Sequence, residues 1–246
     1  MAPKHIGDFT IPSYLVDGDK LLSPSSILSI LQELSYRGSD QLGCGVEFMA
    51  GRGLAWVLSR DHFVVHRYPR IMEKVHLETW YRGFDGLMVL RDYRILSDDG
   101  QPLVDATSAS LIIDINTREL KRTDHLTGVI SPEPQCDESA IGHNADRIVL
   151  RGIQTEDTGI TRTVRYTDTD FVGHLNNTCY LKWAMDCEQQ LGGPVHPGEV
   201  CINFLKETKL GEELTFRRLC GPDGTLYAAL SADGRPSMTC RLRQAV

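Results

Sequence analysis

The stretch "LSDDGQP" at residues 96–102 returns almost unchanged, as "LSADGRP", at residues 230–236. In both copies an Asp-Gly pair stands between apolar runs, which is typical of a tight turn joining two antiparallel strands. Further upstream, "EKVHL" (73–77) and "EELTF" (212–216) share a glutamate followed by alternating apolar positions, at an offset of 139 residues. Chance similarity of two unrelated halves is the alternative. We interpret the repetition as a duplicated unit.

A helical pattern precedes the strands of each half. The first helix is predicted to follow Ser23 as its N-cap, with Pro24 in the first turn and apolar residues at helical spacing as far as Gly38. The second is predicted to begin near His174, and apolar residues recur every four positions from there to Leu191. Each half therefore contains one long helix with a broad apolar surface.

Strand-like stretches surround each predicted helix. In the first half they cover 5–11, 54–66, 74–82, 87–96 and 103–115, and in the second 160–166, 199–206, 212–219, 225–231 and 236–243. Each half thus reads as a strand, a long helix and a meander of about four strands. An antiparallel sheet wrapped around the helix buries such a helix best. We predict an α+β fold, a tandem (double) hotdog.

The repeat also predicts the domain organisation. Residues 1–120 are expected to form the N-terminal hotdog, 121–158 a linker and 159–246 the C-terminal hotdog. Within the linker, residues 121–144 are rich in proline, glycine and acidic residues and lack sustained periodicity.

Composition excludes several classes of function. The chain has 246 residues, 41% hydrophobic and 24% charged, which suits a globular protein. A net charge of −7 disfavours nucleic acid and anionic membranes as partners. No apolar run approaches the roughly 18 residues of a membrane span. Since the N-terminus lacks the pattern of a signal or transit peptide, we expect a cytoplasmic protein.

The seven cysteines form no CxxC pair, which argues against a disulfide framework and fits a reducing compartment. We interpret them mostly as small core residues: Cys44, Cys136, Cys179, Cys187, Cys201, Cys220 and Cys240.

Candidate chemistry is concentrated in "DTDFVGHLNN" (168–177), immediately before the second helix. Unpaired N–H groups at a helix N-terminus could hold the oxyanion that forms when a carbonyl is attacked. A carboxylate beside them could act as a base or a nucleophile. Gly173 would let a substrate carbonyl approach the backbone closely.

The same stretch resembles the D-x-D-x-x-G-H-x-N-N signature of hotdog-fold thioesterases. Around it, "WVLSRDHFVVHRYPRIMEKVHLETW" (56–80), "RDYRI" (91–95) and "NTREL" (116–120) are similar to the fatty acyl–acyl carrier protein (ACP) thioesterases of plants and bacteria. The resemblance covers most of the chain except the linker. It implies a thioesterase that hydrolyses fatty acyl-ACP to free fatty acid and ACP, without a cofactor.

The resemblance also implies the site residues. Asp170 and His174 would be catalytic, together with Glu207 in "FLKETKLGEEL" (204–214). We favour Glu207 as the general base for water and Asp170 as the group that orients the site, and the converse assignment stays open. His174 would polarise or position water and thioester.

Further residues are expected to bind substrate. They are Gly173, Val172, Asn176, Asn177, Thr208 and Trp56. Structural roles compete with several of these assignments: Asp168 suits a turn, the two asparagines suit backbone capping, and Trp56, like Met49 and Met72, suits a core.

Two departures from the family pattern matter. Val172 stands where the ACP thioesterases usually have asparagine, and Thr208 stands where the plant enzymes have cysteine, so that position supplies no thiol nucleophile. The corresponding stretch of the first half, "VDGDKLLSPSS" (16–26), has no histidine, and Tyr68 stands at the position of Glu207. We expect one site per chain.

Alternatives remain on the sequence alone. An acyl-CoA thioesterase could use the same site, and Val172 also suits a non-catalytic protein that binds acyl thioesters. A metal site is not expected, because His62 and His66 share a strand face with no third ligand evident.

The expected partner is ACP carrying a phosphopantetheine thioester, and both a monomer and a homodimer are compatible with the sequence. Two basic clusters could dock the acidic carrier: Arg67, Arg70 and Lys74, or Lys121 and Arg122.

Overall fold

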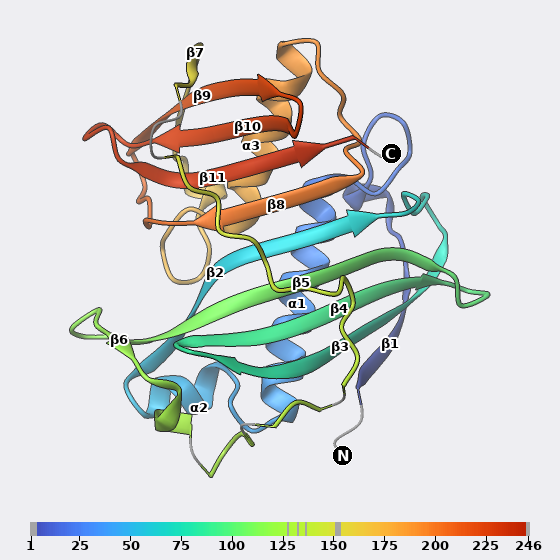
Figure 1. Ribbon diagram of the computed structural model, residues 1–246, viewed down its shortest axis with the longest axis vertical. Helices are drawn as coiled ribbons and strands as arrows, with labels where there is room; N and C mark the ends of the chain where they lie inside the picture. Colours follow the sequence, from blue (N-terminus) through green and yellow to red (C-terminus); the bar gives the residue numbers. More distant parts are fainter. Residues whose placement is uncertain (1–3, 127, 132, 136, 151–153, 245–246) are drawn as a thin grey trace.

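The computed structural model describes residues 4–126, 128–131, 133–135, 137–150 and 154–244. Its described strands form one 11-stranded sheet in the order β1-β3-β4-β5-β2-β8-β11-β10-β9-β7, with β6 beside β5 (Figure 1). All described strand pairs are antiparallel.

The elements of each half follow the predicted order. The first half contains β1 (His5–Thr10), α1 (Pro24–Gln41), α2 (Val46–Gly51), β2 (Leu54–Val65), β3 (Lys74–Asp85), β4 (Met88–Ser97), β5 (Pro102–Asp114) and β6 (Leu120–Lys121). The second contains β7 (Glu156–Thr163), α3 (Asn177–Gln190), β8 (Glu199–Phe204), β9 (Glu213–Gly221), β10 (Gly224–Leu230) and β11 (Pro236–Arg243). Short 3₁₀ turns lie at Ser13–Leu15, Thr123–Leu126 and Tyr166–Asp168.

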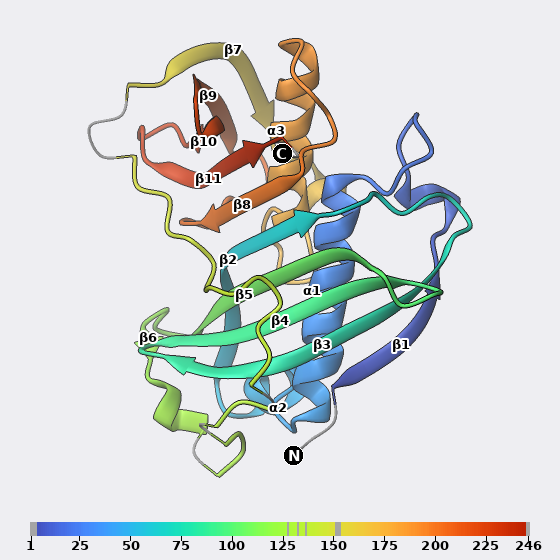
Figure 2. The ribbon, with the colours of Figure 1, turned by 45° about the vertical axis from the view of Figure 1, so that its right-hand side comes forward.

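The two halves meet where β2 pairs with β8, and this pairing makes their sheets continuous. Both long helices, α1 and α3, lie on the same face of that sheet (Figures 1 and 2). One hydrophobic core includes Leu31 of α1, Leu181 of α3, Phe63 of β2 and Val200 of β8, all at most 1% exposed. The fold is the double hotdog that the repeat predicted.

The duplicated turns have the same geometry. In the β4–β5 turn Ser97 N–H donates to the carbonyl of Gln101, and in the β10–β11 turn Ser231 N–H donates to that of Arg235. Gly100 and Gly234 have φ of 82° and 75°, a region that favours glycine. The two Asp-Gly pairs therefore correctly predicted two equivalent hairpins.

The predicted start of the first helix is confirmed, whereas its end and the start of the second helix each differ by three residues. Ser23 caps α1, its hydroxyl accepting a hydrogen bond from Ser26 N–H at 3.2 Å, and the helix continues past Gly38 to Gln41. α3 begins at Asn177 rather than near His174, because a hydrogen-bonded loop occupies the residues before it.

The short helix α2, which has only six residues, was not predicted from the sequence. It covers a smaller hydrophobic cluster that includes Cys44, Met49 and Tyr81, with Trp56 packed against it. Met72, by contrast, is 69% exposed and belongs to no core.

Four cysteines are buried as expected: Cys44, Cys187, Cys201 and Cys240. Cys179 is half-buried, while Cys220 is exposed near the end of β9, so its interpretation as a core residue is wrong. Cys136 lies outside the described residues. No helix of the described chain is long and apolar enough to cross a membrane.

Residues 137–150 belong to the expected linker, yet they are held against the outer face of the sheet (Figure 2). The indole N–H of Trp80 donates to Glu138 O at 2.9 Å, and Ala140 N–H donates to Asp92 Oδ2 at 2.7 Å. Asn203 on β8 bonds the backbone of Asp146 and Ile148 at 2.9 and 2.7 Å. This segment therefore crosses from the first half to the second along a defined path.

The shared core predicts a contrast between two leucines. Leu31→Ala should lower the free energy of unfolding by about 2–5 kcal/mol, because the side chain is 1% exposed and its loss leaves a cavity. Leu210→Ala, at a side chain that is 58% exposed, should change it by no more than about 0.5 kcal/mol. Urea unfolding of both variants measures the difference. Equal losses would contradict the assignment of α1 to the shared core.

Candidate active site

The loop before α3 is closed by the carboxylate of Asp170. Its Oδ1 accepts hydrogen bonds from the N–H groups of Val172 at 2.9 Å and His174 at 3.3 Å. Gly173, with φ of 83°, completes the turn, and its N–H donates to Asp170 O at 3.0 Å. A side chain at position 173 would be strained by this backbone conformation. The glycine and the aspartate together set the direction of His174.

The connection between β8 and β9 anchors this loop. Leu175 N–H donates to Thr208 O at 2.8 Å, and the phenol of Tyr180 on α3 donates to Thr208 Oγ1 at 2.8 Å. Thr208 is 1% exposed, so it lies beneath the loop. Asn176 N–H donates to Asp168 O at 2.9 Å. The loop is thus fixed at both ends.

These hydrogen bonds determine which backbone N–H groups before α3 are free to hold an oxyanion. Each backbone N–H from Val172 to Asn176 already has an acceptor. Asn176 caps α3, its side-chain oxygen accepting from Thr178 N–H at 2.9 Å. The N–H groups of the residues just before α3 are therefore engaged within the loop rather than free.

The three predicted catalytic residues come together beside this loop. His174 Nε2 lies 3.4 Å from Glu207 Oε2, and Asp170 bonds the backbone of His174. Glu207 Oε1 also pairs with Arg118, which reaches across from the turn between β5 and β6. The side chains of His174 and Glu207 are 20% and 40% exposed, so the site opens to solvent.

Arg118 was not predicted as a site residue. It belongs to "NTREL", which the sequence analysis used only as a family-like turn. Its partner lies in the other half of the chain, so no local spacing connects the two residues. Its positive φ of 62° turns the backbone sharply at this point.

The charges around His174 favour a neutral imidazole. Partial burial, followed by the positive charge of Arg118, lowers the pKa of His174 below its ordinary value of 6.5. Lys209 acts in the same direction, while the negative charges of Asp170 and Glu212 oppose it. A neutral imidazole can accept a proton near pH 7.

The expected substrate-binding residues are more dispersed. Val172 is 57% exposed at the tip of the loop, and the neighbouring Phe171 contacts the ring of Tyr36 on α1, with centroids 6.1 Å apart. Asn177 is the first residue of α3. Trp56 lies on β2, and its indole N–H donates to Cys44 O at 2.8 Å.

The first half contains the same loop without its chemistry. Asp17 Oδ1 accepts from the N–H groups of Asp19 at 3.0 Å and Leu21 at 3.3 Å, as Asp170 does from Val172 and His174. Leu21 thus occupies the position of the histidine. Tyr68, at the position of Glu207, donates instead to Pro197 O at 2.6 Å. The loop is a structural element of both halves, and only the copy in the second half contains a histidine of its own, His174, beside Glu207.

Comparison with known proteins also divides the chain into two domains, which correspond to its two halves. The family described as Acyl-ACP thioesterase N-terminal domain matches residues 3–126, and the Acyl-ACP thioesterase C-terminal domain matches residues 154–226. A palmitoyl-acyl carrier protein thioesterase of Gossypium hirsutum is 26% identical over 231 residues, covering 90% of this chain and 53% of the relative. A dodecanoyl-[acyl-carrier-protein] hydrolase of Umbellularia californica is 28% identical over 189 residues, covering 72% and 49%. The chain therefore spans about half the length of these plant relatives.

Solved structures share the fold along the whole chain. An acyl-ACP thioesterase from Bacteroides thetaiotaomicron superimposes with a TM-score of 0.85 at 20% identity, covering 98% of this chain and 97% of that one. The 12:0-ACP thioesterase from Umbellularia californica gives 0.80 at 22% identity, covering 98% and 96%. With both family domains matched in order over most of its residues, this chain belongs to the acyl-ACP thioesterase family.

Proposed function

We propose that this protein hydrolyses fatty acyl-ACP to free fatty acid and ACP. The observation that carries the proposal is the convergence of a neutral imidazole, His174, with the carboxylate of Glu207 on a solvent-accessible loop shaped by Asp170. Two plant relatives, a palmitoyl-acyl carrier protein thioesterase and a dodecanoyl-[acyl-carrier-protein] hydrolase, support this substrate class. The same site could serve acyl-CoA, whose thioester chemistry is identical.

In the proposed reaction Glu207 is the general base. It removes a proton from water that His174 positions, and the water oxygen bonds to the thioester carbon. The tetrahedral oxyanion then collapses, the C–S bond breaks, and the leaving thiolate receives the proton that Glu207 took. The products are a carboxylic acid and the phosphopantetheine thiol, so atoms and charge balance.

The remaining residues have supporting roles in this proposal. Asp170 orients His174, because one of its carboxylate oxygens is occupied by two backbone N–H groups. Arg118 supplies positive charge beside the forming oxyanion. Thr208 supports the loop from below, while Gly173, Val172, Asn176 and Asn177 form the surface on which the thioester lies.

A protein that binds acyl thioesters without hydrolysing them is the second candidate. The observation in its favour is Val172, whose exposed apolar side chain replaces the hydrogen-bonding asparagine usual in the family. Turnover of the unmodified protein separates the two candidates directly. Tight binding of acyl-ACP without thiol release would establish the binding function.

The two equivalent loops allow a matched test of catalysis. Asp170→Asn keeps the oxygen that closes the loop and removes the negative charge that acts on His174, so we expect a folded protein whose thiol release falls by about 100-fold or more. Asp17→Asn makes the same change in the loop of the first half, where Asp17 contacts His196 instead, and should leave turnover unchanged. Glu207→Gln should cost at least as much as Asp170→Asn. Thiol release from a panel of acyl-ACP and acyl-CoA thioesters measures all three.

Two outcomes of this comparison would contradict the proposal. Equal losses in Asp170→Asn and Asp17→Asn would show that the aspartates only shape their loops. A fully active Glu207→Gln protein would exclude the glutamate as the base and leave that role to Asp170.

The charges around His174 predict a pH profile. Because its pKa lies below 6.5, kcat/KM should fall only as the pH drops through a value below 6.5, where the imidazole gains a proton. Arg118→Ala removes a positive charge and should shift this acidic limb to higher pH. Arg37→Ala, which breaks another exposed arginine–glutamate pair, should leave the limb in place. An unmoved limb in Arg118→Ala would contradict the assignment to His174.

Carrier docking is expected near Arg118, at Lys121 and Arg122. Lys121 pairs with Asp114 and Glu119 at 3.6 Å, and the side chain of Arg122 is 80% exposed. Reversing both charges to glutamate should lower kcat/KM for acyl-ACP by about 10-fold or more while sparing a small thioester. The same reversal at Arg67 and Arg70, the other predicted cluster, is the control. Equal loss with both substrates would contradict a docking role.

A further inference from the structure

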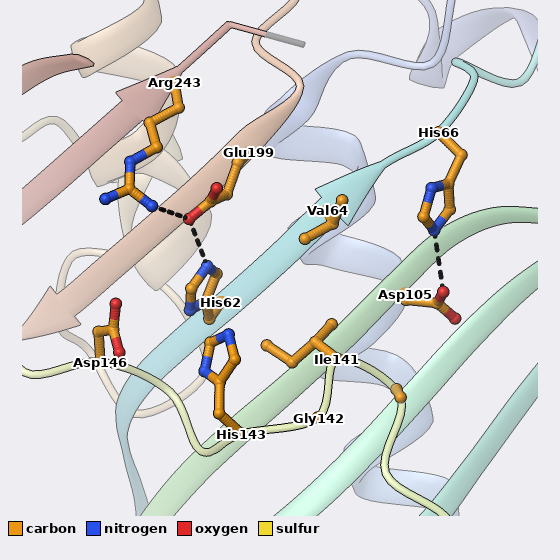
Figure 3. Close-up of a pocket in the computed structure, with 11 residues that line it drawn as sticks. His62, Val64, His66, Asp105, Ile141, Gly142, His143, Asp146, Glu199 and Arg243 are labelled. Atoms are coloured by element: carbon orange, nitrogen blue, oxygen red, sulfur yellow. Dashed lines mark hydrogen bonds and ion pairs between the residues drawn. The ribbon is translucent and has the colours of Figure 1, made fainter. Parts of the chain in front are cut away.

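A pocket of about 520 Å³, lined by both ionisable and apolar side chains, lies on the outer face of the sheet, away from the two helices (Figure 3). It is placed where β2 meets β8 and is bordered by residues 140–143 and Asp146 of the crossing segment. Three histidines line it, and two of them, His62 of β2 and His143 of the segment, have ring centroids 5.0 Å apart. The proposed thioesterase reaction uses none of these groups.

His62 presents an unused nitrogen in this region. Its Nε2 lies 2.8 Å from Glu199 Oε1, and Glu199 is held in turn by Arg243 at 2.9 Å. A carboxylate can only accept, so Nε2 carries the proton and Nδ1 bears a lone pair. That Nδ1 is buried, and it has no hydrogen-bond partner among the described residues. The side chain of His62 is 2% exposed.

Two further potential ligands lie close to His62. Cys201 stands directly opposite His62 in the β2–β8 pairing and is fully buried. Asp146 approaches from the crossing segment and is oriented by Arg241 at 2.6 Å. One ligand atom from each of these three residues lies within 4.8 Å of the others. An imidazole, a thiol and a carboxylate thus converge from three separate segments.

We propose that His62, Cys201 and Asp146 bind a divalent cation, Zn²⁺ above all. Zinc accepts nitrogen, sulfur and oxygen donors in one tetrahedral site. Metal-binding histidines typically donate their second ring N–H to a carboxylate, as His62 does to Glu199. Binding displaces the thiol proton of Cys201. His143, adjacent to His62, is the nearest candidate for a fourth ligand.

The proposed site would fasten the crossing segment to the junction of the two halves. Asp146 belongs to that segment, His62 to the first sheet and Cys201 to the second. A cation bound by all three adds its binding free energy to the folded state only. The role is therefore structural and independent of the proposed hydrolysis.

The other histidines fit a cation less well. His66 shares a strand face with His62, but its Nε2 lies 2.9 Å from Asp105 Oδ2. His196 lies near Asp17 and Asp19, at 2.7 and 3.9 Å, so each of its ring nitrogens faces a carboxylate. The group of His196, Asp17 and Asp19 contains no thiol. A signal that depends on a thiolate therefore distinguishes it from the group around His62.

The test uses the full chain after treatment with a chelator. Titration with Zn²⁺, followed by calorimetry and thermal unfolding, should show one ion per chain and a rise in the unfolding temperature. Co²⁺ should produce a thiolate-to-metal charge-transfer band. Cys201→Ala should abolish that band and weaken Zn²⁺ binding by about 10-fold or more. Cys240→Ala, at another fully buried cysteine on the neighbouring β11, is the matched control and should change neither.

Three results would overturn the proposal. The first is the absence of stoichiometric binding to the unmodified protein. The second is a Co²⁺ band and Zn²⁺ affinity that survive in Cys201→Ala and His62→Ala. The third is loss of binding in His196→Ala alone, which would assign the ion to the group around Asp17.

Discussion

The pairing of β2 with β8 is the constraint on which the rest of the structure depends. It joins two antiparallel sheets into one, so both long helices share a face and a single core. Without it, each half would expose the inner edge of its sheet and one flank of its helix. Antiparallel edges with free N–H and C=O groups associate readily, and here the partner is supplied by the same chain.

That junction also brings together residues from opposite halves. Arg118 of the first half pairs with Glu207 of the second, and His196 of the second bonds Asp17 of the first. Each loop that precedes a helix therefore receives a charged or ionisable residue from the other half. The two environments differ in chemistry because the loops kept their aspartates, while only one kept a histidine.

Most of the fold could be predicted from the sequence, because apolar alternation and Asp-Gly turns are local signals. The start of α3 could not, because the side chain of Asp170 closes a loop that depends on Thr208, more than thirty residues away. Asp170 and His174 were predicted from a motif and Glu207 from its place in a family-like segment. Arg118 was not predicted as a site residue, because its partner Glu207 lies in the other half. The sequence of a turn does not show which charged group its side chains will contact.

The donor set around His62 shows a similar limit. From the sequence, His62 was considered only with His66, on the same strand face, and a metal site was not expected because no third ligand was evident. The thiol comes from a strand that is adjacent only through the junction of the halves, and the carboxylate from a segment that resembled a linker. Local pattern could not predict this cluster, because it depends entirely on tertiary pairing.

The register of that junction has a consequence for symmetry. His62 and Cys201 stand opposite one another and are separated by the same 139 residues that relate the two repeats, so each is the counterpart of the other. They therefore sit on the approximate twofold axis of the molecule. In a dimer of identical hotdogs, a residue at this place would face its own copy, giving two imidazoles or two thiols. Only a tandem chain can put an imidazole opposite a thiol there, so gene duplication made a combination of groups at the axis that symmetry would have forbidden.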